Sequence, residues 1–390
     1  MPRLRLPARL FMRLRSPAAL AVLAVLSACA VNPATGRREF SLVSEGQEIA
    51  MGQEGARQVE ASIGLYPDSA LQAYVSGVGM SMASKSERPT LPWRFGVVED
   101  AAINAFALPG GPIYFTRGIL THMNSEAEMA AVMGHEIGHV TARHSAQQMS
   151  RAQVAQIGLG VGSILSNEIA SVAGAAGTGL GLLLLKYGRE AESQADDLGF
   201  RYMMTDGYDP RAMRDMFIML GRVTGDAGRL PNWLSSHPDP DNRLARTDER
   251  LATLTRDLSA MVVGRQVFLQ RIDGVVFGEN PRSGYFAGQE FLHPDLKFRL
   301  TFPSGWKTHN GTDAVTSISA AEDAIVELRL AAGADPAAAL RAFAAQDGVA
   351  SNQPESTTIN GLPAVTAEWQ AQSQQGVLRG RVAFIAYEGR

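Results

Sequence analysis

Cysteine is almost absent from this sequence of 390 residues, which contains a single one, Cys29. One thiol excludes an intramolecular disulfide framework and any zinc site built on several thiolates. An excess of basic charge is also lacking, because 36 Lys and Arg residues face 39 Asp and Glu residues, a formal net charge of -3. The composition therefore gives no electrostatic reason to expect a nucleic-acid partner.

The sequence is neither strongly polar nor strongly hydrophobic overall. Hydrophobic residues make up 45% of the chain and charged residues 19%, which argues against a disordered chain and against a polytopic membrane protein. A chain of this length is too long for one ordinary domain, and it has enough apolar residues for two separate cores. We therefore expect two globular domains.

The first 28 residues have the pattern of an export signal. They contain five arginines and no acidic residue, and the apolar run Ala18 to Leu26 is shorter than the roughly 20 residues that span a bilayer. The stretch from Leu26 to Cys29 resembles a bacterial lipoprotein signal, which predicts cleavage before Cys29 and lipidation of its thiol. Because Ala30 follows, the resemblance implies an outer-membrane anchor on the periplasmic face. The alternative is an ordinary signal peptide with a chance cysteine.

Residues 44–262 are predicted to form a mainly helical domain with a small sheet. Two short strands, 104–108 and 113–117, flank Pro109-Gly110-Gly111-Pro112 and should form a hairpin. A long helix should begin at a Ser125–Glu128 capping box and continue well past His144. The other expected elements are two helices within 44–86, a strand at 93–99, and helices at 189–204, from 209 and from about 241.

The sequence changes character after about Gly264. Strands are expected at 296–302, 324–331 and 377–387, and a helix at 336–346. This pattern predicts a smaller, separate α+β domain. We therefore divide the chain into a signal peptide (1–28), a linker (29–43), the mainly helical domain (44–262) and an accessory domain (263–390). The accessory domain lacks a charged cluster or metal-ligand spacing, so a substrate- or partner-docking module is its default interpretation.

His135-Glu136-Ile137-Gly138-His139 is an H-E-x-x-H motif inside the predicted long helix. Residues four apart on a helix point to one side, so both imidazoles can reach one metal ion, with Glu136 beside them. The alternative is two histidines that pack on an ordinary helix.

A catalytic zinc ion usually has three protein ligands, so a third ligand is needed. The extended metzincin motif is excluded because Ala142 and Ser145 stand at its later positions. His144 is expected on the opposite face of the helix, as an exposed or packing residue.

Glu192 and Asp196 are the better candidates, because they share one face of the helix predicted at 189–204. Glu192 would bind the metal, and Asp196 would accept a hydrogen bond from the outer nitrogen of a liganding histidine. Ala195 and Gly199 are small enough to let this helix approach the first one closely. The alternative is a surface helix with salt bridges.

Four motifs together resemble the membrane-associated gluzincin zinc metallopeptidases, which include the HtpX, Oma and CAAX prenyl proteases, with the periplasmic lipoprotein (BepA-like) branch nearest. They are Asn104-Ala105-Phe106-Ala107-Leu108-Pro109-Gly110-Gly111, the H-E-x-x-H motif, the Glu192 to Asp196 string and His237-Pro238. The resemblance covers roughly Ser44 to Leu258. No tetratricopeptide pattern follows Gly264, where the BepA-like branch has one.

The resemblance implies roles for individual residues and one Zn²⁺ per chain. His135, His139 and Glu192 would bind the metal, Glu136 would be the catalytic base, and Asp196 would belong to the active site. His237 would lie near the metal, to stabilise the oxyanion or to bind as a fourth ligand that closes the site; the alternative is a turn histidine before a proline.

The strand containing Asn104, Ala105 and Phe106 offers an edge to which an extended substrate can add. The site predicts a zinc metalloendopeptidase, and the resemblance implies that its substrates are misfolded or misassembled cell-envelope proteins. The competing hypotheses are a latent protease that acts as a periplasmic assembly factor for outer-membrane proteins, and a structural lipoprotein without metal.

A glycine-rich apolar segment, 157–185, has two interpretations. Its part 169–185 has no charge and is at the lower length limit for a membrane span. Glycine and serine are frequent in it, which favours a pair of amphipathic helices that cover the cleft or touch the membrane surface.

Overall fold

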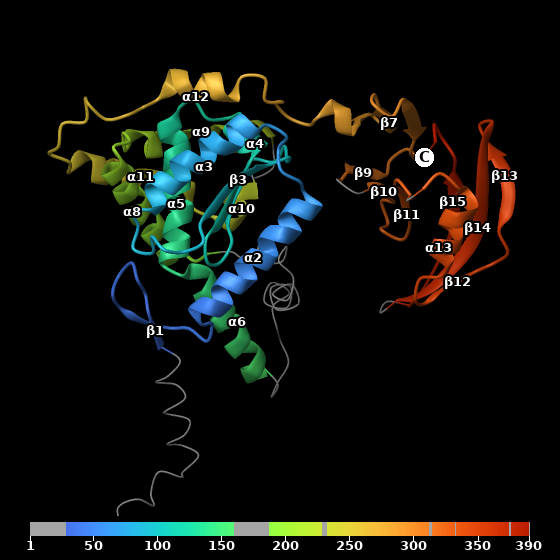
Figure 1. Cartoon of the computed structure of the whole chain (residues 1–390), viewed down its shortest axis with the longest axis horizontal. Helices are drawn as coiled ribbons and strands as arrows, with labels where there is room; N and C mark the ends of the chain where they lie inside the picture. Colours follow the sequence, from blue (N-terminus) through green and yellow to red (C-terminus); the bar gives the residue numbers. More distant parts are fainter. Residues whose placement is uncertain are drawn as a thin grey trace, which may run out of the picture. The chain divides into compact units, whose positions relative to one another are not determined.

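The chain divides into two compact units, 1–280 and 281–390 (Figure 1). The computed structural model describes residues 29–159, 187–227, 232–311, 314–331, 333–373 and 376–389. The expectations for the signal peptide 1–28 and for 160–185 of the glycine-rich segment therefore lie outside the described residues.

A three-stranded sheet forms one layer of the first unit. Its strands are β3 (Arg94–Val98), β4 (Ala105–Ala107) and β5 (Pro112–Thr116), in the order β3-β5-β4. β4 and β5 pair antiparallel, which confirms the predicted hairpin, whereas β3 and β5 are parallel. Gly110 and Gly111 have φ of 72° and 134° in the connection, a conformation that favours glycine. β4 therefore lies at one edge of this sheet.

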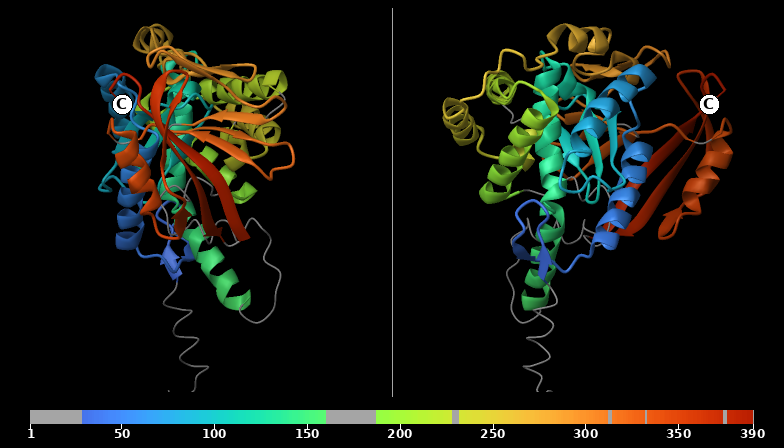
Figure 2. Two further views of the ribbon diagram at one scale, coloured as in Figure 1. Left: turned by 90° about the vertical axis from the view of Figure 1, so that its right-hand side faces the viewer. Right: turned by 60° about the vertical axis from the view of Figure 1, so that its left-hand side comes forward.

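Helices make up most of the rest of the first unit. They are α2 (Glu45–Ser62), α3 (Ser69–Ala83), α4 (Arg117–Leu120), α5 (Glu126–Thr141), α6 (His144–Leu159), α8 (Arg189–Asp206), α9 (Arg211–Ala227), α10 (Asn232–Ser236), α11 (Pro240–Ala252) and α12 (Arg265–Ile272). α5 runs through the middle, in contact with β4 of the sheet and with α8 and α9 (Figure 2). All of its residues from Ala127 to Thr141 are buried.

The second unit is an assembly of small antiparallel sheets with one α-helix among its described residues. Its elements are η2 (Pro281–Ser283), β6 (Tyr285–Ala287), β7 (Glu290–His293), β8 (Phe298–Thr301), β9 (Lys307–Asn310), β10 (Val315–Ile318), β11 (Ile325–Leu328), α13 (Pro336–Ala344), β12 (Val349–Ser351), β13 (Glu355–Ile359), β14 (Leu362–Ser373) and β15 (Gly376–Ile385). α13 packs against β14 and β15, and Phe343 contacts Trp369 and Phe384. The fold class α+β is confirmed.

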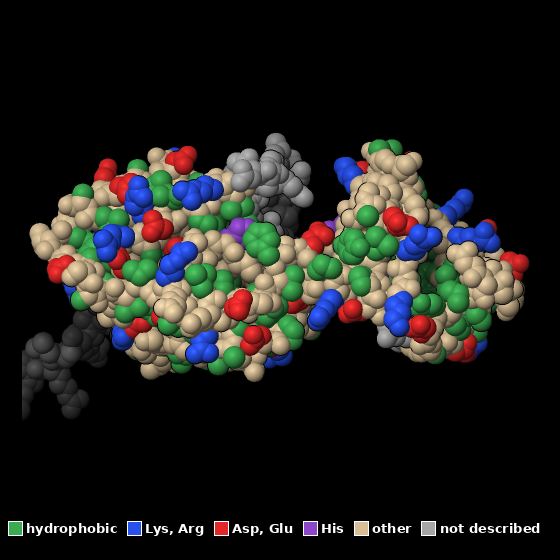
Figure 3. All heavy atoms as spheres, turned by 90° about the horizontal axis from the view of Figure 1, so that it is seen from above, with side chains coloured by type: hydrophobic (Ala, Val, Ile, Leu, Met, Phe, Trp, Pro, Cys, Tyr) green, Lys and Arg blue, Asp and Glu red, His purple; other side chains and the backbone are tan. Residues whose placement is uncertain are grey.

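The visible surface carries charges of both signs. Figure 3 shows acidic and basic side chains interspersed on this face of the molecule. Among the described residues, we find no helix with the length and apolar character needed to cross a bilayer.

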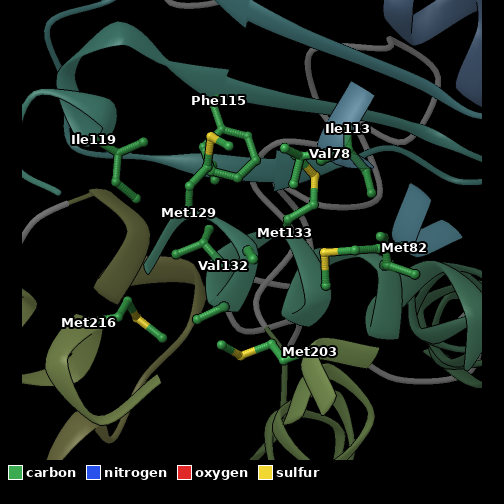
Figure 4. Packing of buried hydrophobic residues seen from close by; sticks show 14 of the residues in the cluster. Val78, Met82, Ile113, Phe115, Ile119, Met129, Val132, Met133, Met203 and Met216 are labelled. Carbon is green, nitrogen blue, oxygen red and sulfur yellow. The ribbon is translucent and has the colours of Figure 1, made fainter. Parts of the chain in front are cut away.

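The main core of the first unit lies around α5. Apolar side chains from α3, the sheet, α8 and α9 converge on it (Figure 4). Met129, Val132 and Met133 on α5 are fully buried, and Met203 of α8 and Met216 of α9 face them from the other side. Methionine adapts to irregular gaps between helices, so this packing fixes α5 relative to the neighbouring helices.

One of the two hydrogen bonds predicted for the N-terminal capping box of α5 is present. The Ser125 hydroxyl accepts the Glu128 backbone N–H, but the Glu128 carboxylate accepts the N–H of Asn124 at 2.9 Å, one residue earlier than in a capping box.

The expectation that the helix continues past His144 is wrong. α5 ends at Thr141, Arg143 has a φ of 61°, and α6 begins at His144. The left-handed residue interrupts the run of helical hydrogen bonds and changes the direction of the chain.

The division between the units falls later in the chain than residue 262. Phe268 of α12 is fully buried in the core of the first unit, and the Arg117 guanidinium donates to the carbonyls of Val276 and Gly278. Residues 263–280 therefore pack with the helical unit.

The segment 29–43, expected to be a linker, contains a β-ribbon of β1 (Cys29–Val31) and β2 (Arg38–Phe40). The Leu42 N–H donates to the Ser150 hydroxyl at 2.9 Å. The segment is thereby attached to α6.

Candidate metal centre

Two histidines on α5 belong to a buried cluster of polar side chains. His135 and His139 lie one turn apart, their Nε2 atoms are 2.9 Å apart, and neither side chain is exposed. A turn of helix aims both rings to the same side, as expected from the spacing. Two imidazole nitrogens at this distance offer lone pairs to one shared ion.

α8 brings a carboxylate to these two rings because glycines let it approach α5 closely. A Cβ atom added at Gly199 would lie 2.8 Å from the backbone nitrogen of His135, and one at Gly138 would lie 2.9 Å from the carbonyl oxygen of Ala195. The prediction that Ala195 and Gly199 permit a close approach is confirmed. The main chains of α5 and α8 are therefore in direct contact next to the two histidines.

Glu192 of α8 completes a set of donors with the spacing of a zinc site. Its carboxylate oxygens lie 3.6 Å from Nε2 of His135 and 3.5 Å from Nε2 of His139. Tetrahedral zinc with bonds of about 2.0–2.2 Å separates its ligand atoms by about 3.4 Å. The two distances to Glu192 therefore fit a shared zinc ion.

His237 follows α10 and joins the same cluster. Its Nδ1 lies 3.2 Å from Nε2 of His135 and 3.0 Å from Oε1 of Glu192, and its Nε2 lies 3.6 Å from Oε1 of Glu136. One donor atom from each of His135, His139, Glu192 and His237 lies within 4.8 Å of all the others. The structure therefore places His237 among the candidate ligands, next to Glu136.

The protonation states of His139 and Glu192 suit metal binding, which requires neutral imidazoles and ionised carboxylates. Burial holds the pKa of His139 well below its ordinary value, so the ring is neutral. Burial alone would raise the pKa of Glu192, but His237, His139 and Arg243 together hold it well below the ordinary value. Glu136 differs, because burial raises its pKa above the ordinary value despite the opposing effect of His237.

Asp196 forms a hydrogen bond with Nδ1 of His135, the ring nitrogen that faces away from the other donors. Nδ1 of His135 donates to Oδ1 of Asp196 at 2.9 Å. The same carboxylate receives two hydrogen bonds from Arg243 of α11, at 2.8 and 2.6 Å, and Arg243 forms a further ion pair of 2.9 Å with Glu192. Arg243 was not among the residues predicted from sequence, although this buried cation pairs with both Glu192 and Asp196.

Trp233 is a second residue that the sequence analysis missed. Its indole N–H donates to Oε1 of Glu136 at 3.3 Å, and its ring stacks on His237 at a centroid distance of 4.7 Å. Its backbone N–H donates to the carbonyl of Ile103 at 3.2 Å. α10 is thereby fastened beside the start of β4, where the predicted substrate-binding residues Asn104, Ala105 and Phe106 lie.

These residues together define a class of metal site. Two histidines of an H-E-x-x-H helix and a glutamate from a second helix are the donor set of gluzincin-type metallopeptidases, and a carboxylate behind the first histidine orients it. Residues 69–251 match the family model of Peptidase family M48. This stretch of the chain is therefore similar to the M48 peptidases in sequence as well as in its site.

Relatives with this domain carry protease names. The chain is 32% identical over 227 residues to the beta-barrel assembly-enhancing protease of Escherichia coli (strain K12), which is 56% of this chain and 46% of the relative. It is 31% identical over 228 residues to the mitochondrial metalloendopeptidase OMA1 of Schizosaccharomyces pombe (56% of this chain, 65% of the relative). It is 29% identical over 171 residues to the metalloprotease YcaL of E. coli K12 (42% and 63%). The chain spans about half the length of the first of these relatives.

Proposed function

We propose that this protein is a zinc-dependent endopeptidase with one zinc ion per chain. The observation that carries the proposal is the buried cluster in which donor atoms of His135, His139 and Glu192 converge, with each histidine Nε2 3.5–3.6 Å from a Glu192 oxygen. Zinc in such a site lowers the pKa of a bound water and polarises the carbonyl of the scissile bond. The three residues would hold the ion from one side, with Glu136 next to them.

Glu136 would be the base of the reaction. Its carboxylate is buried beside the donors, and burial raises its pKa, so it can take a proton from water and later give it to the leaving amine. The Trp233 indole N–H fixes one of its oxygens. Asp196 would keep His135 oriented through Nδ1.

Two roles for His237 agree with its position. As a donor to a developing oxyanion it would accelerate the reaction. As a fourth ligand, through Nδ1 only 3.2 Å from Nε2 of His135, it would occupy the position that water needs. The second role is the basis of the alternative function below.

The edge of β4 is the proposed place for substrate. Among the described residues β4 pairs with β5 alone, and α5 lies against it. An extended peptide that adds to this edge would be recognised through its backbone, with Asn104, Ala105 and Phe106 as contacts. Such recognition suits unfolded segments of many sequences.

We further propose that the substrates are misfolded or misassembled cell-envelope proteins and that the enzyme is a lipoprotein. Lipid on Cys29 would anchor it to the outer membrane, facing the periplasm, and the 157–185 segment is a second candidate membrane contact. The name of the E. coli relative refers to β-barrel assembly, which supports an envelope role. Of the domains predicted from sequence, the C-terminal one would be an accessory docking module.

The alternative is a latent protease that acts mainly as an assembly factor for outer-membrane proteins. One observation favours it: Glu136 is only 1% exposed and His237 only 2% exposed, so almost none of either side chain lies at the surface. Opening of the structure would then be required before any cleavage.

Casein cleavage and zinc content test both hypotheses, with wild type, Glu136→Gln and His237→Ala assayed in parallel. A protease should bind one zinc per chain, cleave casein and lose cleavage in Glu136→Gln with its zinc retained. A wild type that is inactive and a His237→Ala variant that cleaves would indicate latency. Absence of cleavage in both, with zinc bound, would contradict the protease.

The anchor has a separate test. Labelled palmitate should be incorporated into wild type but not into Cys29→Ala. Incorporation that survives this substitution would show that Cys29 does not carry the lipid.

A further inference from the structure

The break between α5 and α6 is held by buried charges from α2. Arg143, at the break, donates from Nε to the Glu48 carboxylate at 2.8 Å, and Glu48 is 1% exposed. Arg88 binds the same carboxylate at 2.9 Å and donates to the carbonyl of Val140, also at 2.9 Å. The left-handed turn at Arg143 is thus fixed by contacts with distant parts of the chain. Its effect is on the residue that follows, His144.

The expectation that His144 lies on the opposite face of the helix is therefore wrong. The changed chain direction buries the ring to 3% exposure and places its Nδ1 2.9 Å from Nδ1 of His139. Its Nε2 lies 2.7 Å from Oε1 of Gln194 on α8. His144 thus bridges a candidate metal ligand and the neighbouring helix.

The two hydrogen bonds of His144 can be arranged in only one direction that leaves a lone pair on Nε2 of His139 for a metal. Oε1 of Gln194 accepts, so the proton of His144 sits on Nε2 and its Nδ1 is an acceptor. His139 must then donate from Nδ1, which leaves its Nε2 unprotonated and directed at the cluster. The reverse direction would place a proton on that Nε2, where the metal would have to bind.

We propose that His144 and Gln194 are positioning residues that fix the tautomer and the ring orientation of His139. They would act on this ligand as Asp196 acts on His135. A direct ligand role for His144 does not fit, because its Nδ1 faces the outer nitrogen of His139. The inference rests on the metal site proposed above.

Paired substitutions separate hydrogen bonding from packing. His144→Asn keeps an acceptor oxygen near the position of Nδ1, whereas His144→Leu removes the acceptor but keeps an apolar group. Gln194→Glu keeps the acceptor for His144, and Gln194→Leu removes it. His122→Leu is the control, because the Nδ1 of this histidine bonds to the carbonyl of Gly118, at 2.7 Å, in the turn after α4, and to no other group among the described residues.

Zinc affinity, measured by competition with a chromogenic chelator on the full chain, is the main measurement. Loss of a partner behind a liganding histidine weakens metal binding by about 10–100-fold. We expect a loss of this size in His144→Leu and Gln194→Leu, and affinity close to wild type in His144→Asn, Gln194→Glu and the control. The absorption bands of the Co²⁺-loaded protein should change in the two leucine variants only.

The outcomes are distinct. A wild type that binds no zinc would refute the proposed function itself. A wild type that binds zinc, with unchanged affinity and cobalt bands in both folded leucine variants, would overturn this inference alone. Thermal unfolding of the metal-free proteins identifies folded variants, and if His144→Leu does not fold, the Gln194 pair decides.

Discussion

The direct contact between α5 and α8 gives a quantitative prediction for Gly199→Ala. The added Cβ would lie 2.8 Å from the nitrogen of His135 and 3.0 Å from the carbonyl carbon of Gly134, whereas ordinary contacts begin at 3.4 Å. Both neighbours are backbone atoms of a fully buried helix, which cannot rotate away as a side chain can. α8 must therefore move by about 0.6 Å relative to α5.

This displacement should weaken metal binding more than it weakens the fold. Glu192 lies two turns before Gly199 and moves with α8, whereas metal–ligand distances tolerate only about 0.2 Å. We expect zinc affinity to fall about tenfold or more. Crowding should cost about 1–3 kcal/mol of unfolding free energy, partly offset by about 1 kcal/mol from the better helix propensity of alanine.

Gly77→Ala is the matched control for this experiment. Gly77 is exposed inside α3, and its added Cβ would meet nothing within 4 Å. This variant should gain about 0.4–1 kcal/mol and keep its zinc affinity. Urea unfolding and chelator competition measure both quantities. If Gly199→Ala gains the same stability and binds zinc as wild type does, a close approach of the helices is not what assembles the centre.

Three further predictions concern stability. Arg243→Met should cost about 3–5 kcal/mol of unfolding free energy in urea, because Asp196 is left as a buried anion without its cation; a loss below 1 kcal/mol would contradict this account. Gly207→Ala should lower thermal stability by about 1 kcal/mol, since φ is 89° at this helix end, and an unchanged melting temperature would count against it. Burial and a hydrogen bond to Glu126 raise the pKa of Tyr208 above 10.0. The unfolding free energy should therefore fall as the pH rises beyond that value, and it should fall less in Tyr208→Phe. Equal pH profiles of the two proteins would refute the raised pKa of Tyr208.

Those parts of the centre that depend on helical periodicity were predictable from sequence. The spacing of His135 and His139 places both rings on one side of α5, and that of Glu192 and Asp196 does the same on α8. The structure adds the contact of 2.9 Å between Asp196 and Nδ1 of His135. Local sequence was sufficient here because helical geometry is repeated from turn to turn.

The break at Arg143 was not predictable in this way. No glycine or proline marks it between Thr141 and Ser145, and the positive φ is stabilised by Glu48, which precedes Arg143 by 95 residues. A long-range contact therefore determined the local conformation, and the position of His144 with it.

Arg243 was missed for a different reason. It shares α11 with Arg246 and Arg250, which pair with the exposed Asp197, and the helical spacing does not distinguish the buried arginine from the two at the surface. Trp233 lies in a proline-rich stretch whose sequence gives no sign of contact with Glu136. Burial, which decides both cases, is a property of the packed unit and not of the local pattern.

The order of the donors along the chain has a consequence for protein synthesis. His237 follows His135 by 102 residues, and Arg243, the cation that pairs with Glu192, comes later still. When synthesis has reached the end of α8, three of the four donors have been made. Glu192 then still lacks Arg243, the cation that pairs with it. The cluster is complete only when α11 has been made and has packed, so a half-made chain does not yet possess the assembled donor set.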